Sequence, residues 1–458
     1  MRAQFCAVAG GLFACLIALA FVPTPAIAQS EIQAITSPAG IEAWLVEEDT
    51  VPLIAMTAIW DGGAAQDPKE REGTSSMLAQ LLDQGAGEMD AAAFQTRVEE
   101  LAIRLSFDTG KDNFSAALRT LPGAADEAFS LLGLALTEPR LDDSAVERVR
   151  RQLMTAYAMG EDDPGTLASR AFTTAIYPDH PYGRLTDGTP ESLQAIGKDD
   201  LSAMAEKMLA RDNLHIAIVG PVSPEKAGEL IDRAFGGLSR KADLATIPPA
   251  TPAAAEMIVD ERDFPQSVAR FGMQGLKRED PDFIPAYVMN YVLGGGSFSS
   301  RLMEEVREQR GLAYSVWSAL SPFKEGGLWL GQVATRNESF GQSLSIIEGE
   351  IAKMAKTGIT ADELADAKTY LTGSYPLRFS SNQEIAEQLA GIKFADLGID
   401  YVDMRNALIE AVTLEDIDRV AKRLLDPDAL LVTVVGQPIL ETDASQADAA
   451  SPEGRSAQ

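Results

Sequence analysis

Two stretches of the chain, residues 199–209 and 415–425, repeat apolar side chains at positions i, i+3, i+4 and i+7. That spacing places the apolar side chains on one face and predicts an amphipathic helix in each stretch. A polar turn and then a continuous apolar run follow each helix, at residues 216–220 and 432–436, and such a run is typical of a buried strand. The two units align without a gap at an offset of 216 residues. The alignment predicts two domains related by duplication.

Within each half, strand-like runs come before helix-like runs. Strands are predicted at residues 41–46, 53–60, 267–273 and 326–335, the first two as a pair. Helices are predicted at residues 75–82, 94–105 and 281–293. Separate β and α runs favour an α+β fold class, here two homologous α/β-sandwich domains in tandem.

Proline and alanine interrupt this pattern between the two halves. Residues 247–255 contain three prolines, which have no amide donor and resist both helix and sheet. We therefore predict a linker at 241–257, between an N-terminal domain at 29–240 and a C-terminal domain at 258–438. Apolar periodicity is absent from 439–458, which predicts a disordered tail.

The first 28 residues have the pattern of an export signal. Arg2 precedes an apolar run at 13–22, which is shorter than the ~20 residues of a membrane span, and a cleavage site ends at Ala28. We expect a periplasmic protein without a membrane anchor. Both cysteines, Cys6 and Cys15, lie in this segment, so the mature chain has no thiol for a disulfide, a metal site or a nucleophile.

Composition limits the classes of partner. The chain of 458 residues is 46% hydrophobic, which is enough for two cores. Asp and Glu outnumber Lys and Arg by 68 to 39, for a net charge of −29. Nucleic acid is not expected as a partner, because binding to its backbone relies on clustered basic residues. The charge favours solubility and is compatible with basic peptide substrates.

Several motifs resemble those of the insulinase/pitrilysin-like zinc metallopeptidases, the inverzincins. Residues 71–80 resemble the helix on which that family carries H-x-x-E-H, and residues 162–164 and 177–183 are similar to other family segments. Residues 300–314 are the most specific match. The resemblance covers nearly all of 32–438, and it implies a two-domain chain that forms half of a clam-shell chamber.

The resemblance also implies that the chain has lost its zinc site. In H-x-x-E-H, two imidazoles on one helix face hold zinc, and the glutamate activates the metal-bound water. The matching positions are Ser76, Ala79 and Gln80, and the position of the remaining glutamate ligand is Ala156. None of these side chains supplies the required ligand or base. We expect no metal and no cofactor in this chain.

The two histidines of the mature chain do not replace that site. Zinc requires at least three protein ligands, and His180 and His215 are 35 residues apart. His180, in a Pro-rich turn, is predicted to order that turn. His215, on an apolar strand, is predicted to be a satisfied core histidine.

The second half retains Arg307 and Tyr314, which match an arginine and a tyrosine that the resemblance places opposite the zinc. There they hold the substrate backbone, and the tyrosine hydroxyl can stabilise an oxyanion. Spacing alone favours a solvated helix for Arg307 and a half-buried strand position for Tyr314; the family motif favours substrate binding. Upstream, Gly294, Gly295 and Gly296 either let a peptide backbone approach closely or form a flexible helix end.

The chain lacks the residues that bind zinc in the family but retains the two that bind substrate. This combination suggests that it works together with a second subunit. We expect a non-catalytic, substrate-binding subunit of a periplasmic zinc metallopeptidase heterodimer, inactive alone, as in the substrate-binding subunits of processing peptidases. A sister subunit would supply H-x-x-E-H and zinc, and the substrates would be peptides. Two alternatives stay open: a non-enzymatic scaffold resembling the core subunits of respiratory complexes, and a peptide-binding protein that acts alone.

Overall fold

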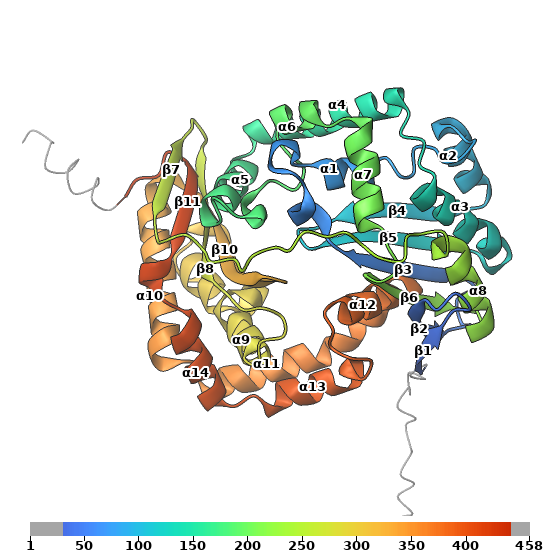
Figure 1. The fold of residues 1–458 in the computed structure, drawn as a ribbon. Coiled ribbons are helices and arrows are strands. Elements are labelled where there is room, and N and C mark those ends of the chain that lie inside the picture. The colour runs from blue at the N-terminus through green and yellow to red at the C-terminus, as the bar shows by residue number, and fades with distance from the viewer. Residues whose placement is uncertain (1–30, 441–458) are drawn as a thin grey trace, which may run out of the picture.

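The computed structural model describes residues 31–440, which form two β-sheets with helices on both sides of each (Figure 1). The predicted export signal and residues 441–458 of the predicted tail lie outside the described residues. The two-domain α+β architecture agrees with the prediction. Among the helices of residues 31–440, none has the length and hydropathy that a bilayer span requires.

The N-terminal sheet contains six strands in the order β1-β2-β6-β3-β5-β4. Their bounds are β1 (Ile32–Thr36), β2 (Glu42–Glu47), β3 (Ile54–Asp61), β4 (Arg104–Thr109), β5 (Asn113–Thr120) and β6 (Leu214–Gly220). Strand β6 lies between β2 and β3, parallel to the first and antiparallel to the second. The predicted pairing of residues 41–46 with 53–60 is therefore wrong, because a strand from much later in the chain enters between them.

The C-terminal sheet repeats this insertion. Its order is β7-β11-β8-β10-β9. The bounds are β7 (Met257–Glu261), β8 (Gln266–Gln274), β9 (Ala313–Phe323), β10 (Gly326–Arg336) and β11 (Leu431–Gly436). Strand β11 lies between β7 and β8, parallel to β7, as β6 lies between β2 and β3. The shared topology supports the duplication that the sequence repeat predicts.

Helices of the same half cover one face of each sheet. In the first half they are α1 (Thr74–Ala79), α2 (Ala91–Glu100), α3 (Ala125–Thr137), α4 (Asp143–Met159), α6 (Pro190–Ala195), α7 (Lys198–Met208) and α8 (Pro224–Phe235). In the second half they are α9 (Phe283–Asn290), α10 (Phe340–Thr357), α11 (Ala361–Gly373), α13 (Tyr401–Ala411) and α14 (Leu414–Leu424).

The predicted helix at 94–105 is correct only in its first part. Helix α2 ends at Glu100, and β4 begins at Arg104. Between them Ala102 has a positive φ of 50°, a left-handed conformation that ends the helix and turns the chain into the sheet. An alanine gives no sequence signal for such a turn.

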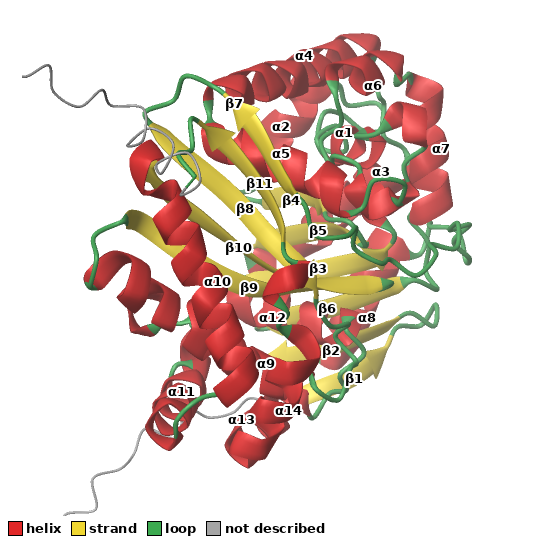
Figure 2. Cartoon of the chain, turned by 90° about the vertical axis from the view of Figure 1, so that its left-hand side faces the viewer, coloured by secondary structure: helices red, strands yellow, loops and turns green. Residues whose placement is uncertain are grey.

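The opposite face of each sheet is covered by a helix from the other half (Figures 1 and 2). Helix α5 (Pro164–Ile176) packs on β8 and β11, where the Thr433 hydroxyl donates a 2.9 Å hydrogen bond to the Ala168 carbonyl. Helix α12 (Asn382–Phe394) packs on β3 and β6, where the Asn382 amide donates a 2.8 Å bond to the Leu53 carbonyl. Each half thus completes the core of the other.

The segment between the halves, residues 241–256, contains no helix or strand. It contacts both halves through its backbone: Ala253 N donates to Ile176 O at 2.8 Å, and Ala250 N donates to Glu325 O at 2.6 Å. The segment is therefore packed between the two domains.

Candidate functional site

The positions of the lost zinc ligands lie on two neighbouring helices. Ser76 and Ala79 are buried on α1, Gln80 ends that helix, and Ala156 is exposed on α4, which contacts α1. The Ser76 hydroxyl donates a 2.7 Å hydrogen bond to Oδ1 of Asp187. These residues do not fit zinc, because they include no imidazole or carboxylate and the one hydroxyl is already bonded. In residues 31–440, no group of three or more His, Cys, Asp or Glu side chains is arranged to hold a metal.

A buried carboxylate, which the sequence analysis missed, holds the start of α1. Asp67 accepts hydrogen bonds from the amides of Gly73 and Ser75 at 2.9 and 3.0 Å and from the Ser75 hydroxyl at 2.6 Å. Burial raises the pKa of Asp67 to about 6, and burial lowers the pKa of nearby Lys111 to about 8. This end of α1 is thus fixed by hydrogen bonds within the chain.

The prediction that His180 orders its turn is confirmed. Its Nδ1 accepts a 3.1 Å hydrogen bond from the Tyr182 amide, and Nε2 lies 2.8 Å from the Pro248 carbonyl, to which it donates. Both ring nitrogens are therefore engaged. The prediction for His215 is wrong in part, because the side chain is 23% exposed and its Nε2 only approaches Oδ1 of Asp61, at 3.4 Å. Its ring packs edge-on against that of Phe394, the last residue of α12, with 5.7 Å between the ring centres.

The structure brings Arg307 and Tyr314 together with a third residue, Phe298. The Arg307 guanidinium lies 4.8 Å from the centre of the Phe298 ring and 5.2 Å from that of Tyr314, within the range of cation–π attraction. Its Nε lies 3.3 Å from a Glu308 carboxylate oxygen. Tyr314 is 79% exposed. The alternative that Tyr314 is a half-buried strand residue is therefore wrong.

Two π-helical turns flank the loop that carries Phe298. One spans Tyr291–Gly295 and the other Met303–Glu308, which includes Arg307. A π-turn widens the helix and redirects its side chains, and such turns are frequent at functional sites. The apolar spacing predicts regular helix as far as Leu293 and gives no signal for either turn.

The three glycines of this loop have different surroundings. Gly294 is buried, and a Cβ there would lie 2.4 Å from the Ser318 hydroxyl oxygen on β9. It therefore allows close packing inside the protein. Gly295 is exposed and Gly296 partly exposed, although a Cβ on Gly296 would lie 2.7 Å from the Tyr291 carbonyl oxygen. A ligand could approach only these last two.

An ion pair anchors the segment after the loop. Arg301 donates two hydrogen bonds to the Glu363 carboxylate, at 2.7 and 2.8 Å, and a third to the Gly358 carbonyl at 3.1 Å. The bonds from Arg301 lower the pKa of Glu363 to about 2. Arg301 thus has a structural role, fixing the base of the helix that carries Arg307 to the start of α11.

Two family models match the chain. The model of the insulinase family, peptidase family M16, matches residues 46–189, and that of the peptidase M16 inactive domain matches residues 195–371. The two matches lie end to end and take in most of both domains.

Individual relatives agree with these models. A protein of Helicobacter pylori named non-peptidase homolog YmxG is 29% identical over 347 residues, covering 75% of this chain and 79% of its own. An uncharacterized zinc protease of Streptomyces coelicolor is 28% identical over 425 residues and 90% of each chain. The crystal structure of a peptidase M16 inactive domain from Pseudomonas fluorescens superposes with a TM-score of 0.84 at 28% identity, covering 90% of this chain and 98% of that one. The chain belongs to the insulinase family of peptidases, family M16, and its positions for that family's zinc ligands hold no metal-binding side chain.

Proposed function

We propose that the protein is the substrate-binding subunit of a periplasmic zinc metallopeptidase heterodimer. The observation that carries the proposal is the group formed by Phe298, Arg307 and Tyr314, in a chain whose zinc-ligand positions hold no metal-binding side chain. A sister subunit would carry H-x-x-E-H and the zinc. The N-terminal export pattern supports the periplasmic location.

The geometry suits binding of a peptide backbone. The Arg307 guanidinium lies near the rings of Phe298 and Tyr314, and its N–H groups can donate hydrogen bonds to peptide carbonyls. The exposed Tyr314 presents a hydroxyl that can donate a hydrogen bond. These two residues would hold and orient the peptide, while hydrolysis would depend on the partner. The substrate-binding residues of this chain and the zinc site of the partner would each be insufficient alone.

The test begins with a pull-down of the tagged mature protein from its own periplasmic extract. We expect a co-purifying protein of similar size that carries H-x-x-E-H, and a reconstituted pair that cleaves peptides. Arg307→Ala and Tyr314→Phe should each lower kcat/KM roughly tenfold or more, the scale of losing a donor to the reacting group.

Arg310→Ala is the matched control. Arg310 follows the same π-turn but pairs with Glu305 at 2.6 Å, and it should not affect activity. Full activity of the Arg307 and Tyr314 variants would remove both residues from the mechanism. Recovery of the protein alone would instead favour a peptide-binding protein without a catalytic partner.

A further inference from the structure

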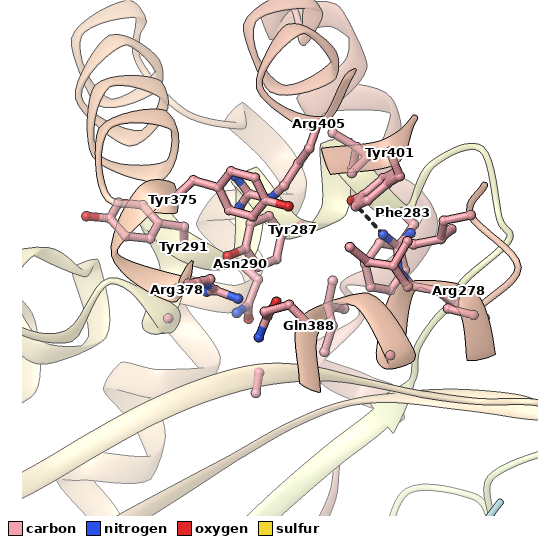
Figure 3. A pocket seen from close by; sticks show the side chains of 18 of the residues that line it. Arg278, Phe283, Tyr287, Asn290, Tyr291, Tyr375, Arg378, Gln388, Tyr401 and Arg405 are labelled. Carbon is pink, nitrogen blue, oxygen red and sulfur yellow. Dashed lines mark hydrogen bonds between the residues drawn. The ribbon is translucent and has the colours of Figure 1, made fainter. Parts of the chain in front are cut away.

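A cavity of about 500 Å³ lies in the second half, beside the loop that carries Phe298. Its walls come from α9, β9, α12, α13 and the short helix Tyr375–Phe379 (Figure 3). Gly295, at the end of the first π-turn, lines the cavity and is three positions before Phe298. The cavity therefore reaches the start of the loop that carries Phe298, and it has the size of pockets that hold small ligands.

Three arginines line the cavity of this strongly acidic chain. Arg278 donates to the Tyr401 hydroxyl at 2.7 Å (Figure 3), and Arg405 donates to the Leu371 carbonyl and the Asn406 amide oxygen at 3.1 and 3.2 Å. Arg378 is exposed.

The acceptors of Arg278 and Arg405 are thus neutral, so their positive charge is not compensated by these bonds. Arg405 is only 6% exposed, and the Asp403 carboxylate, which is not part of the lining, lies near the Tyr375 hydroxyl together with Arg405. The lining includes one carboxylate, on Glu387, which is exposed and accepts a 2.9 Å hydrogen bond from Gln383. The cavity therefore suits an anionic guest.

Aromatic rings form much of the remaining wall. The Arg405 guanidinium lies 4.1 Å from the centre of the Tyr375 ring, and that of Arg278 lies 4.3 Å from the Phe283 ring. In Figure 3, Arg378 and Gln388 extend from different walls toward the same part of the cavity. Apolar rings, amide groups and guanidinium donors together match the side chains, backbone and carboxylate of a peptide.

We infer that this cavity binds a carboxylate group of a peptide, either its free C-terminus or an acidic side chain. A guanidinium can hold a carboxylate through two parallel hydrogen bonds, which gives geometric selectivity as well as affinity. The inference rests on the proposal that the chain binds peptides, but it does not require a partner subunit. The substrate class would be peptides that carry a carboxylate. The net negative charge of the chain would repel acidic peptides in general, and this cavity would retain a peptide whose carboxylate enters it.

The experiment measures binding of octapeptides of glycine, serine and tyrosine to the mature protein by fluorescence anisotropy, with an N-terminal dansyl label because that fluorophore carries no carboxylate. Three forms are compared: a free C-terminal carboxylate, a C-terminal amide, and an amide with one internal glutamate. We expect the amide without glutamate to bind roughly tenfold more weakly than the free acid. Equal affinity of the glutamate-containing amide and the free acid would identify a side-chain carboxylate as sufficient.

Arg378→Gln tests the site itself, because an exposed arginine can be replaced with little risk to folding. We expect the free acid to lose about tenfold in affinity and to approach the amide. Arg336→Gln is the control, since Arg336 is 63% exposed in the same half and does not line the cavity. A wild-type protein that binds all three peptides equally, or none, would overturn the inference.

The outcome is separable from the test of the proposed function. Arg307→Ala and Tyr314→Phe should leave the preference for the free acid over the amide intact. Conversely, an absent carboxylate preference would not affect the loss of activity expected for those two variants in the reconstituted pair.

Discussion

At the scale of single residues, the role proposed for Arg307 depends on its two aromatic neighbours. Arginine has a long side chain with many rotamers, and a ligand would normally have to immobilise it. Here the rings of Phe298 and Tyr314 restrict the guanidinium before any ligand is present. If Arg307 binds a peptide as proposed, part of the entropy cost of ordering its side chain is already met in the free protein.

The Arg301–Glu363 pair leads to a prediction about pH. Glu363 has a pKa of about 2, below the ordinary value of 4.5, so the pair stabilises the fold at neutral pH. That contribution is lost as the pH falls from about 4.5 through 2. Glu363→Gln should therefore lower the free energy of unfolding at pH 7 by about 2 kcal/mol, and the difference from wild type should shrink between pH 5 and pH 2.

Urea unfolding of both proteins at a series of pH values measures this difference. Glu338→Gln is the comparison, because its partner Arg336 lies 3.7 Å away and both side chains are more than 60% exposed. An exposed pair of this kind contributes at most about 1 kcal/mol. A Glu363→Gln difference that stays constant from pH 7 to pH 2 would contradict the role assigned to the pair.

At the scale of elements, the exchange of α5 and α12 couples the two domains. The face of α12 that meets the first sheet includes Ala386 and Ala390, which are fully buried, and Leu389, which is 1% exposed. Small side chains let the helix approach the strands closely, and the leucine fills the space that remains. The first domain therefore depends on a helix from the second.

Leu389→Ala tests this dependence. Removing a buried leucine side chain leaves a cavity and should cost 2–5 kcal/mol. Because Leu389 packs on strands of the first half, we expect the first half to be destabilised by a substitution in the second. Hydrogen exchange of residues 43–46 and 216–219, read by mass spectrometry, should become faster.

Leu377→Ala provides the control for that substitution. Leu377 is 74% exposed in the same half, and its removal should change stability by no more than about 0.5 kcal/mol. Unchanged exchange in the first sheet of the Leu389→Ala protein would mean that α12 does not stabilise it.

At the scale of the whole molecule, the hairpin between β9 and β10 joins the halves. The Tyr182 hydroxyl donates to Asp112 at 2.7 Å and accepts from the Glu325 amide at 3.0 Å. The Lys324 amide donates to the other Asp112 oxygen at 2.8 Å, and its ammonium group bonds to Asp61. The hairpin tip of the second half is thus held at the edge of the first.

Tyr182→Phe should weaken this connection. The change leaves the Glu325 amide and the Asp112 carboxylate each without one partner, at a cost of about 1–3 kcal/mol. Amide exchange at residues 323–326 should become faster than in wild type. Tyr157→Phe, which keeps the ring that packs against Arg170, should not change it. Equal protection of the hairpin in the Tyr182→Phe protein would show that the hydroxyl does not hold the two halves together.

Part of the candidate site could be predicted from residue identity. The absence of zinc ligands at Ser76, Ala79, Gln80 and Ala156 is evident from the sequence, because ligand chemistry depends on which side chain is present. Neither Phe298 nor Asp67 could be identified in this way. Phe298 matters because its ring lies near the Arg307 guanidinium, and Asp67 matters because its carboxylate lies at the start of α1. Both roles depend on where the side chain lies in the folded chain.

The same distinction holds for the fold. Apolar periodicity and the repeat at 216 residues determined the duplication, the α+β class and the helix–turn–strand unit at the end of each half, because those are local patterns that recur in register. Only the tertiary structure decided that β6 and β11 enter between earlier strands, that α5 and α12 exchange sheets, and that the arginine-lined cavity forms between α9 and α12. The physical reason is that a buried strand or helix face is apolar whichever partner covers it, so periodicity reveals that a face is buried but not what buries it.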